Sequence, residues 1–357
     1  MSDDEQEPYE DAWSDQDTTP GKVEAALREM LATRHHEAHA FVPARVLNMV
    51  VIADREYRGE IENRLQRVGR FNPSRLILCS VSEGRKTIDS SVRIGTSQFA
   101  GPGHIAVGHE RVGLHIGPRH LEALDTIVDP LLVPDLATMV WAPHGHTTAV
   151  DSLARLAQIV LLDSQDEPTV SGGFGRSKKL AEHAYVVDLA WLRSTPWRER
   201  IAAAFDPPVE RSRLGSIASV TVRHREDSLA AAVLFCGWLS SRLGWRPGQL
   251  ASVSGKLTGH ARARRQEVKI TLEPANQNAP GLAGVTVETA SGEAVSLDRA
   301  SGGLRSLRRA RDGHEESWTV LGASRGESGI LGEGVRQALL RDPTYKPALN
   351  CARVFVS

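Results

Sequence analysis

The sequence predicts an α/β protein of two domains: an N-terminal, mostly parallel sheet with added antiparallel strands, and a C-terminal α+β domain. The chain has 357 residues, of which 41% are hydrophobic and 24% charged, and this is enough to form two cores of ordinary size. In the first half a strand, a helix and a strand follow one another directly. In the second half a strongly apolar helix precedes several segments in which apolar and polar residues alternate.

The first unit of the parallel sheet is predicted between residues 45 and 80. Residues 45–52 and 75–80 are almost continuously apolar, which is typical of buried strands, and residues 57–68 carry apolar side chains at helical spacing. A strand, helix and strand of these lengths form a βαβ unit with parallel pairing and a right-handed crossover. The arrangement is Rossmann-like.

Other segments extend this sheet. Residues 138–142 and 159–163 predict two further buried strands. Residues 91–94 and 105–114 alternate apolar and polar side chains and predict antiparallel or edge strands. We therefore expect a parallel core with antiparallel additions.

Composition suggests where the domains end. Residues 1–20 are acidic and poor in aliphatic side chains, so we expect a disordered tail. The N-terminal α/β domain is then expected over residues 21–165 and the C-terminal α+β domain over residues 213–357. Residues 166–212 are expected to be a central linker segment, and the glycine-rich stretch 172–179 a flexible connection.

The C-terminal domain is predicted from one helix and several strands. Residues 229–243 form an apolar helix that ends at Gly244, and residues 330–340 form the last amphipathic helix. Residues 354–356 are expected to return to a sheet. The predicted strands cover residues 217–222, 268–272, 285–289 and 318–320.

Charge and cysteine content limit the classes of partner. The net charge is −1, so no global field favours nucleic acid, and no apolar run is long enough to span a bilayer. We expect neither a membrane nor a nucleic acid as partner. The three cysteines lie far apart in apolar surroundings, and the acidic N-terminus is unlike a signal peptide. These features predict a cytoplasmic protein with reduced thiols.

The search for catalytic chemistry finds no convincing constellation. The glycine-rich stretch 172–179 lacks the spacing of a phosphate-binding loop, and the first βαβ unit lacks the glycine motif that holds a pyrophosphate. His144 and His146 are close in sequence, but no acidic residue or cysteine pair accompanies them at a metal-binding spacing. We therefore expect no catalytic residues, no metal site and no cofactor.

An alternative is a regulatory protein that binds a sugar phosphate or a nucleotide. In open α/β sheets, ligands bind outside the carboxyl ends of the strands. The residues that the predicted sheet places at this edge are Asp54, Ser80, Trp141, His144, His146 and Asp163.

The segment 186–202 is unusual, because it combines two tryptophans, several arginines and an aspartate around Pro196. Ser194 and Thr195 are suitable N-cap residues for a helix that begins at this proline. Trp and Arg often provide most of the binding energy at protein interfaces, but tryptophans also fill cores. Two hypotheses therefore stay open, a partner-binding surface and a junction between the domains. The residues concerned are Asp188, Trp191, Arg193, Thr195, Pro196, Trp197 and Arg198.

Several motifs resemble the glucose-6-phosphate dehydrogenase assembly protein family (OpcA), of actinobacterial type. The central one is Asp188-Leu189-Ala190-Trp191 followed by Thr195-Pro196-Trp197-Arg198. Others are Asn72-Pro73-Ser74-Arg75, Asp129-Pro130-Leu131-Leu132-Val133-Pro134-Asp135 and Gly237-Trp238-Leu239.

The resemblance implies a protein without a reaction of its own. It implies a subunit that binds glucose-6-phosphate dehydrogenase and allosterically promotes its active oligomer. That activity would support the oxidative pentose phosphate pathway, a part of carbohydrate metabolism, and the supply of NADPH.

Overall fold

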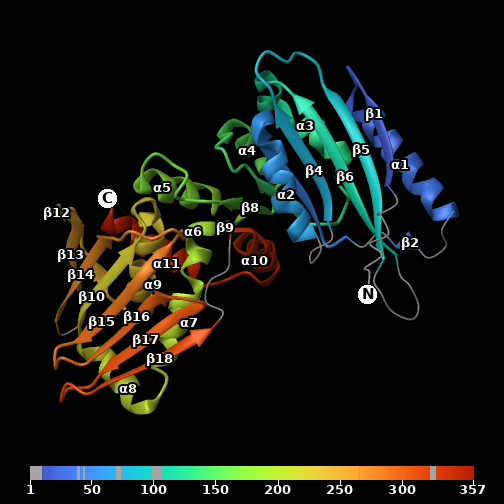
Figure 1. Cartoon of the computed structure of the whole chain (residues 1–357). Coiled ribbons are helices and arrows are strands. Elements are labelled where there is room, and N and C mark those ends of the chain that lie inside the picture. The colour runs from blue at the N-terminus through green and yellow to red at the C-terminus, as the bar shows by residue number, and fades with distance from the viewer. Residues whose placement is uncertain are drawn as a thin grey trace. The chain divides into compact units, whose positions relative to one another are not determined.

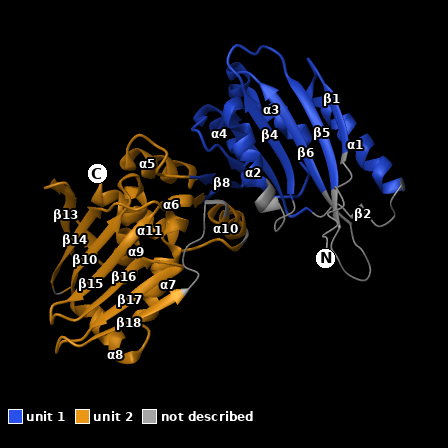
Figure 2. Ribbon diagram, in the orientation of Figure 1, with its two compact units in different colours: residues 1–162, 183–186 blue, residues 163–182, 187–357 orange. Residues whose placement is uncertain are grey.

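Figure 1 shows a computed structural model of the chain. The structure describes residues 10–37, 41–42, 45–69, 74–98, 106–264, 266–321 and 327–357. The chain divides into two compact units, coloured separately in Figure 2. Unit 1 comprises residues 1–162 and 183–186, and unit 2 comprises residues 163–182 and 187–357. Among the described residues, no helix combines the length and the apolar character needed to cross a membrane.

The N-terminal sheet is mostly parallel, as predicted. Within the described residues its strand order is β1-β5-β6-β4-β3-β7-β8-β9, and β2 pairs with β6. Strand β3 pairs in parallel with both β4 and β7, whereas β5 runs antiparallel to β1 and β6. The strands are β1 (Glu10–Asp15), β2 (Phe41–Val42), β3 (Leu47–Asp54), β4 (Ser74–Val81), β5 (Asp89–Gln98), β6 (Ala106–Ile116), β7 (Thr138–Trp141), β8 (Ile159–Leu162) and β9 (Tyr185–Asp188).

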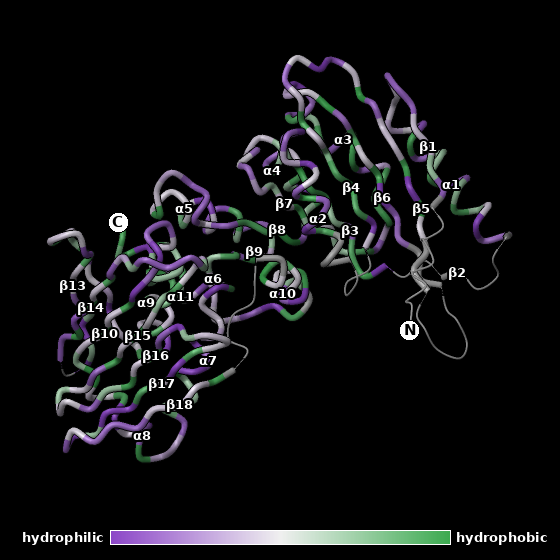
Figure 3. The backbone as a smooth tube through the Cα atoms, viewed as in Figure 1, coloured by the Kyte–Doolittle hydropathy of each residue, from purple (hydrophilic) through white to green (hydrophobic). Residues whose placement is uncertain are grey.

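The core of unit 1 follows from the apolar runs of the sequence. Strands β3 and β4 are apolar almost throughout (Figure 3). Val50, Val51 and Ile52 are fully buried. Helix α2 buries Ile61 and Leu65 on one face. Because both faces of a parallel sheet are covered, its strands need apolar residues on both sides. The helices of this unit are α1 (Pro20–Glu37), α2 (Arg58–Gly69), α3 (Leu124–Val128) and α4 (Thr147–Ser152).

The prediction of a disordered tail over residues 1–20 is wrong for its second half. Residues Glu10–Asp15 form β1, which pairs antiparallel with β5 and places Trp13 opposite Val92. Arg34 of α1 is buried and donates a hydrogen bond to Asp11. Pairing with an existing strand edge compensates for the low hydrophobicity of this segment. Residues 1–9 lie outside the described residues.

The sheet of unit 2 is mainly antiparallel. The described strands have the order β11-β13-β14-β10-β15-β16-β17-β18, and β12 pairs with β13. Strands β10 and β14 are parallel neighbours at its centre. The strands are β10 (Ile217–His224), β11 (Arg246–Pro247), β12 (Ala251–Val253), β13 (Lys256–Arg262), β14 (Glu267–Pro274), β15 (Leu282–Thr289), β16 (Ala294–Ala300), β17 (Gly303–Arg309) and β18 (Glu315–Leu321).

Helix α9 is the centre of the core of unit 2. It is buried along most of its length and ends at Gly244, whose φ of 68° fits the predicted C-terminal glycine. Helix α11 packs closely against it at Gly237, where a Cβ atom would lie 2.3 Å from the carbonyl oxygen of Ala348. The helices of unit 2 are α5 (Val170–Leu180), α6 (Leu189–Arg193), α7 (Thr195–Ala204), α8 (Pro208–Arg213), α9 (Leu229–Leu243), α10 (Glu327–Leu340) and α11 (Tyr345–Phe355).

The segment 166–212 is not a linker, because most of it folds into helices of unit 2 and Tyr185–Asp188 form strand β9. Residues 172–179 lie in α5. Thr169 caps this helix by accepting a hydrogen bond from the Gly172 amide, and Phe174 is fully buried. An N-cap and a buried aromatic side chain thus outweigh the low helix propensity of the glycines.

Two predictions for the C-terminus are also wrong. Residues 330–340 are not the last helix, because α11 follows α10. Residues 354 and 355 do not return to a sheet but form the end of α11. Ala348, Ala352 and Phe355 are fully buried and recur at helical spacing, and this buried face favours the helix.

Candidate functional site

Asp188 marks the start of helix α6. It is the most buried acid of residues 186–202, called here the central segment, with 1% of its surface exposed. Its Oδ1 accepts hydrogen bonds from the amides of Ala190 at 3.0 Å and Ser164 at 3.1 Å. Its Oδ2 accepts one from the Tyr345 hydroxyl at 2.9 Å. The carboxylate therefore links the starts of α6 and α11 with the chain after β8.

Burial also changes the acidity of this carboxyl group. The pKa of Asp188 is raised to about 6, first because of burial and then because of the nearby negative charge of Asp163. The hydrogen bonds from Ser164 and Tyr345 act in the opposite direction. Arg193 binds Asp163, with 2.6 Å between Nη1 and Oδ2.

Trp191 lies in α6 between an aromatic ring, a cation and a carboxylate. Its Nε1 donates to Oδ2 of Asp342 at 2.9 Å, and its ring centroid is 5.5 Å from that of Tyr345. The guanidinium carbon of Arg198 lies 3.4 Å from the Trp191 centroid. This is a cation–π contact inside the protein, where desolvation strengthens it.

Arg198 of helix α7 is also buried. It donates hydrogen bonds to the hydroxyl oxygens of Ser194 at 3.1 Å and Thr195 at 2.8 Å. Its Nη1 lies 3.7 Å from Oδ2 of Asp342. Burial lowers the pKa of Arg198 to about 10, and the attraction of Asp342 limits this effect. The side chain remains a cation at neutral pH.

Helix α7 is fixed by the rest of the central segment. Pro196 lies in its first turn, as predicted. The Trp197 side chain is only 1% exposed, and Arg299 of strand β16 lies 5.9 Å from its ring centroid. The structure thus gathers the predicted residues in unit 2, where the side chains of Asp188, Trp191, Trp197 and Arg198 face inward. The outward residues of α7 are Glu199, Arg200, Ala202 and Ala203.

Sequence reasoning missed Asp342 and Tyr345, which complete this network. Asp342 contacts Trp191 and Tyr345 contacts Asp188, and in each pair the two residues are about one domain length apart in sequence. No local sequence pattern therefore connects them. A buried tryptophan would have been the useful signal, because its indole N–H needs a hydrogen-bond acceptor from elsewhere in the fold.

Some of the residues predicted to form a ligand crevice at the carboxyl edge of the N-terminal sheet lie close together. Asp54, at the end of β3, lies 3.1 Å from Nε2 of His146, and the ring of His144 lies 4.2 Å from that of Tyr57. Burial lowers the pKa of His144. These residues at the ends of β3 and β7 therefore contact one another.

The other crevice candidates have different surroundings. Ser80 and Trp141 are buried, with 1% and 2% of their surfaces exposed. Asp163 belongs to unit 2 and binds Arg193. Among the described residues, no group of three or more His, Cys, Asp or Glu side chains could hold a metal ion.

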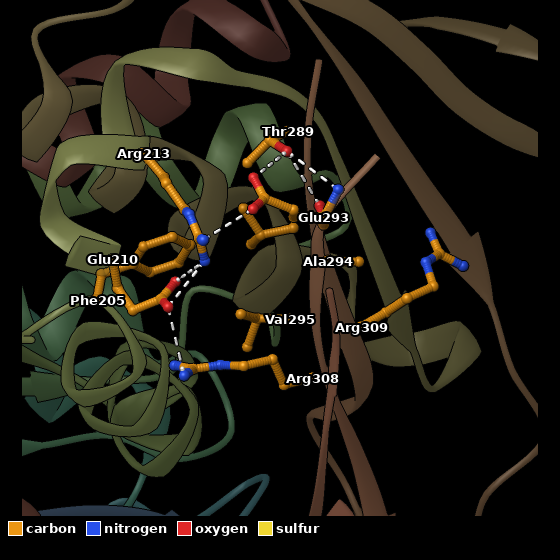
Figure 4. Close-up of a pocket in the computed structure, with 10 residues that line it drawn as sticks. Phe205, Glu210, Arg213, Thr289, Glu293, Ala294, Val295, Arg308 and Arg309 are labelled. Atoms are coloured by element: carbon orange, nitrogen blue, oxygen red, sulfur yellow. Dashed lines mark hydrogen bonds and ion pairs between the residues drawn. The ribbon is translucent and has the colours of Figure 1, made fainter. Parts of the chain in front are cut away.

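A small pocket that the sequence did not predict lies at one end of the sheet of unit 2 (Figure 4). Phe205, Val287 and Val295 form part of its apolar lining. Arg213 binds Glu210 at 2.8 Å and Glu293 at 2.9 Å across the pocket, as the dashed lines show. Acids and arginines thus neutralise each other, and this arrangement favours a structural role.

Comparison with protein families matches both halves of the chain. Residues 65–176 match a family described as the N-terminal domain of a glucose-6-phosphate dehydrogenase subunit. Residues 184–349 match a second family, described as the C-terminal domain of the same kind of protein.

Curated relatives come from cyanobacteria and carry the description OxPP cycle protein OpcA. The protein from Synechococcus elongatus is 29% identical over 55% of this chain and 45% of its own length. The Synechocystis protein is 25% identical over 62% of this chain and 47% of its own. The chain therefore matches about half the length of these relatives.

The fold is also similar to that of solved structures, of which one is the enzyme named in the family descriptions above. Glucose-6-phosphate 1-dehydrogenase from Mycobacterium avium aligns with a TM-score of 0.52 at 10% identity, over 87% of this chain and 91% of that chain. This likeness supports the fold alone. Because the two domain families match in order along most of the chain, the chain belongs to the glucose-6-phosphate dehydrogenase assembly protein family, OpcA.

Proposed function

We propose that this chain is a non-catalytic subunit that binds glucose-6-phosphate dehydrogenase and promotes its active oligomer. The observation that supports this most directly is the match of both domains to families described as parts of a glucose-6-phosphate dehydrogenase subunit. Through that enzyme the chain would support the oxidative pentose phosphate pathway and the supply of NADPH. It would work in the cytoplasm, where its free cysteines stay reduced.

The chemistry of the central segment supports a binding role rather than a catalytic one. Asp188 accepts hydrogen bonds at both of its oxygens, and Arg198 binds hydroxyl groups and an aromatic ring of the same unit. These contacts hold α6 and α7 in place. They do not aim a reactive group at a bound substrate.

We place the contact with the dehydrogenase on the outward side of α7. The buried Trp197 and Arg198 fix this helix, while Glu199, Arg200 and Ala203 are exposed. The central segment then contributes to binding through the helix that it positions. An exposed arginine on a rigid helix provides both charge and defined geometry.

Activation requires a difference in affinity between the states of the partner. A subunit that binds the active and the inactive oligomer equally well shifts no equilibrium, whatever its affinity. The proposed surface must therefore fit the active dehydrogenase better.

The test is an activity titration of glucose-6-phosphate dehydrogenase from the same organism with the full chain. We expect activity to rise to a plateau. Arg200→Glu should raise the concentration needed for half the effect by about tenfold, the size of a 1.4 kcal/mol loss. Arg119→Glu, at an exposed site of unit 1, is the matched control. Equal titration curves for both variants would exclude α7 as the contact surface, and an unchanged rate with the wild-type chain would contradict the function.

A further inference from the structure

Strand β18 lies at one edge of the sheet of unit 2 (Figure 1). It pairs with β17, and no other strand of the described chain pairs with it. Its seven residues, Glu315–Leu321, keep a single register with β17 and include no proline or lysine. Residues 315–319 are all exposed. Within the described residues, the second side of β18 is therefore open to a further strand, and we call it the free edge.

The opposite edge of the same sheet is protected against further pairing. It ends in two short strands, β11 with two residues, one of which is Pro247, and β12 with three. Native sheets block their edges with short strands, proline, lysine or bulges, because an unpaired edge is a template for another strand. Apart from two glutamates at its start, β18 carries no such device. The free edge thus remains able to accept a strand.

The register shows which backbone groups point to the free edge. The hairpin that joins β17 to β18 closes with a hydrogen bond of 2.8 Å from the amide of Ala310 to the carbonyl oxygen of His314. In an antiparallel ladder, hydrogen-bonded pairs alternate with pairs whose N–H and C=O groups point away from each other. The alternation starts at this closing pair, so Trp318 is hydrogen-bonded to β17. Ser317 and Thr319 then present their N–H and C=O groups to the free edge.

The side chain of Trp318 lies on the face of the sheet that α7 covers. Trp318 is opposite Ser306 of β17, which is opposite Leu297 of β16, and the last two are buried. Two positions further along β17 on this face, Arg308 donates a hydrogen bond of 3.0 Å to the carbonyl oxygen of Ala204 in α7. Helix α7 thus reaches β17, whereas Trp318 on the next strand is 44% exposed. A large aromatic side chain therefore lies uncovered beyond α7, at the free edge.

The two glutamates of β18 have no arginine or lysine partner within the part of the chain that the structure describes. The register places Arg309 opposite Glu315 and Arg308 opposite Glu316. Both arginines bind acids of other elements instead. The start of β18 therefore suits a segment that carries a basic side chain, whereas Trp318 suits an apolar one.

We propose that the free edge of β18 binds an extended segment of glucose-6-phosphate dehydrogenase as an additional strand. Backbone hydrogen bonds to Ser317 and Thr319 provide affinity, and the side chains of Trp318 and Glu315 select an apolar and a basic residue. This inference rests on the proposed function, and position supports the choice of partner. Strand β18 lies within residues 184–349, which match a domain of a dehydrogenase subunit, and it continues the surface next to α7.

Hydrogen exchange of the full wild-type chain tests the proposal without a variant. A saturating amount of the dehydrogenase from the same organism should slow amide exchange in the peptide that covers residues 315–321 by about tenfold or more. A complex that forms and raises activity while this peptide exchanges unchanged would overturn the proposal and leave the proposed function intact. Absence of any complex would overturn both. Slowing in the chain alone, as its concentration rises, would show that a second copy occupies the edge and would also overturn the proposal.

A proline at the free edge provides the second test. Thr319→Pro removes an N–H that points to the free edge and leaves the hydrogen bonds to β17 in place. The concentration of chain needed for half the activation should rise about tenfold or more, with an unchanged melting temperature. Ser252→Pro, on the exposed strand β12 of the opposite edge, is the matched control and should titrate like the wild type. Equal titration curves for the two proline variants would contradict strand addition at β18.

Discussion

Trp191 and Arg198 share one acceptor, Asp342, and stack on each other with 3.4 Å between the guanidinium carbon and the ring centroid. The contact joins α6 to α7, and Asp342 joins both to the segment that leads into α11. The tryptophans and arginines that stand out in the sequence thus form an interior network. Their effect on a partner would be exerted through the exposed side of α7.

Replacement of Trp197 should show this structural role. Its side chain is 1% exposed, whereas that of Trp318 on β18 is 44% exposed. We expect Trp197→Ala to lower the free energy of unfolding by about 3–5 kcal/mol. Trp318→Ala should change it by about 0.5 kcal/mol or less. Chemical denaturation of both variants checks this, and equal losses would contradict the assignment of Trp197 to the core.

Asp188 should make stability depend on pH. Its pKa in the folded chain is about 6, above the ordinary value of 3.8. Between these values the folded state binds more protons than the unfolded state, so this group lowers stability as the pH rises from about 4 to 6. Asp188→Asn keeps the shape and removes this dependence.

The measurement is the difference in unfolding free energy between Asp188→Asn and wild type across that pH range. We expect the variant to gain relative to wild type as the pH rises, by on the order of 2 kcal/mol. A difference that does not vary with pH would mean that Asp188 ionises normally in the fold.

Replacing either of two glycines of helix α5 by alanine should change the stability of the chain in opposite directions. A Cβ atom at Gly173 would lie 2.2 Å from the carbonyl oxygen of Ser164, whereas nothing lies within 4 Å of one at Gly175. Gly175→Ala should stabilise the chain by about 0.5–1 kcal/mol through helix propensity. Gly173→Ala should destabilise it, because the backbone must move. Thermal melting compares the two, and similar melting temperatures would argue against the close approach of α5 to Ser164.

The cysteines should be poor nucleophiles in the native chain. Burial raises the pKa of Cys79 to about 12, and it also raises the pKa values of Cys236 and Cys351. We expect slow alkylation of all three thiols near neutral pH and fast alkylation after unfolding. Mass spectrometry after brief iodoacetamide treatment measures this. Rapid native modification of Cys79 would mean that β4 opens readily.

The parts of the fold that could be predicted depend on local patterns. Strands β3 and β4 and helix α9 are long and strongly apolar, so their periodicity alone identifies them. Strand β1 and helix α5 could not be predicted in this way. The first is stabilised by pairing with β5, and the second by an N-cap and a close approach to Ser164.

The candidate site could likewise be predicted only where a local sequence pattern marks its residues. The sequence marked Trp191 and Arg198 by their residue types and spacing. It could not indicate that Asp342 and Tyr345 bind the same segment, because those contacts exist only after α10 and α11 have packed. The exposed side of α7 likewise became visible only once Trp197 was placed in the interior.

The most direct test of the proposed function is the mass and activity of glucose-6-phosphate dehydrogenase, measured together in the presence and absence of the full chain. We predict a co-eluting complex in which the dehydrogenase has a larger oligomeric mass and a higher specific activity. Separate elution and unchanged activity over a range of substrate and thiol concentrations would contradict the account.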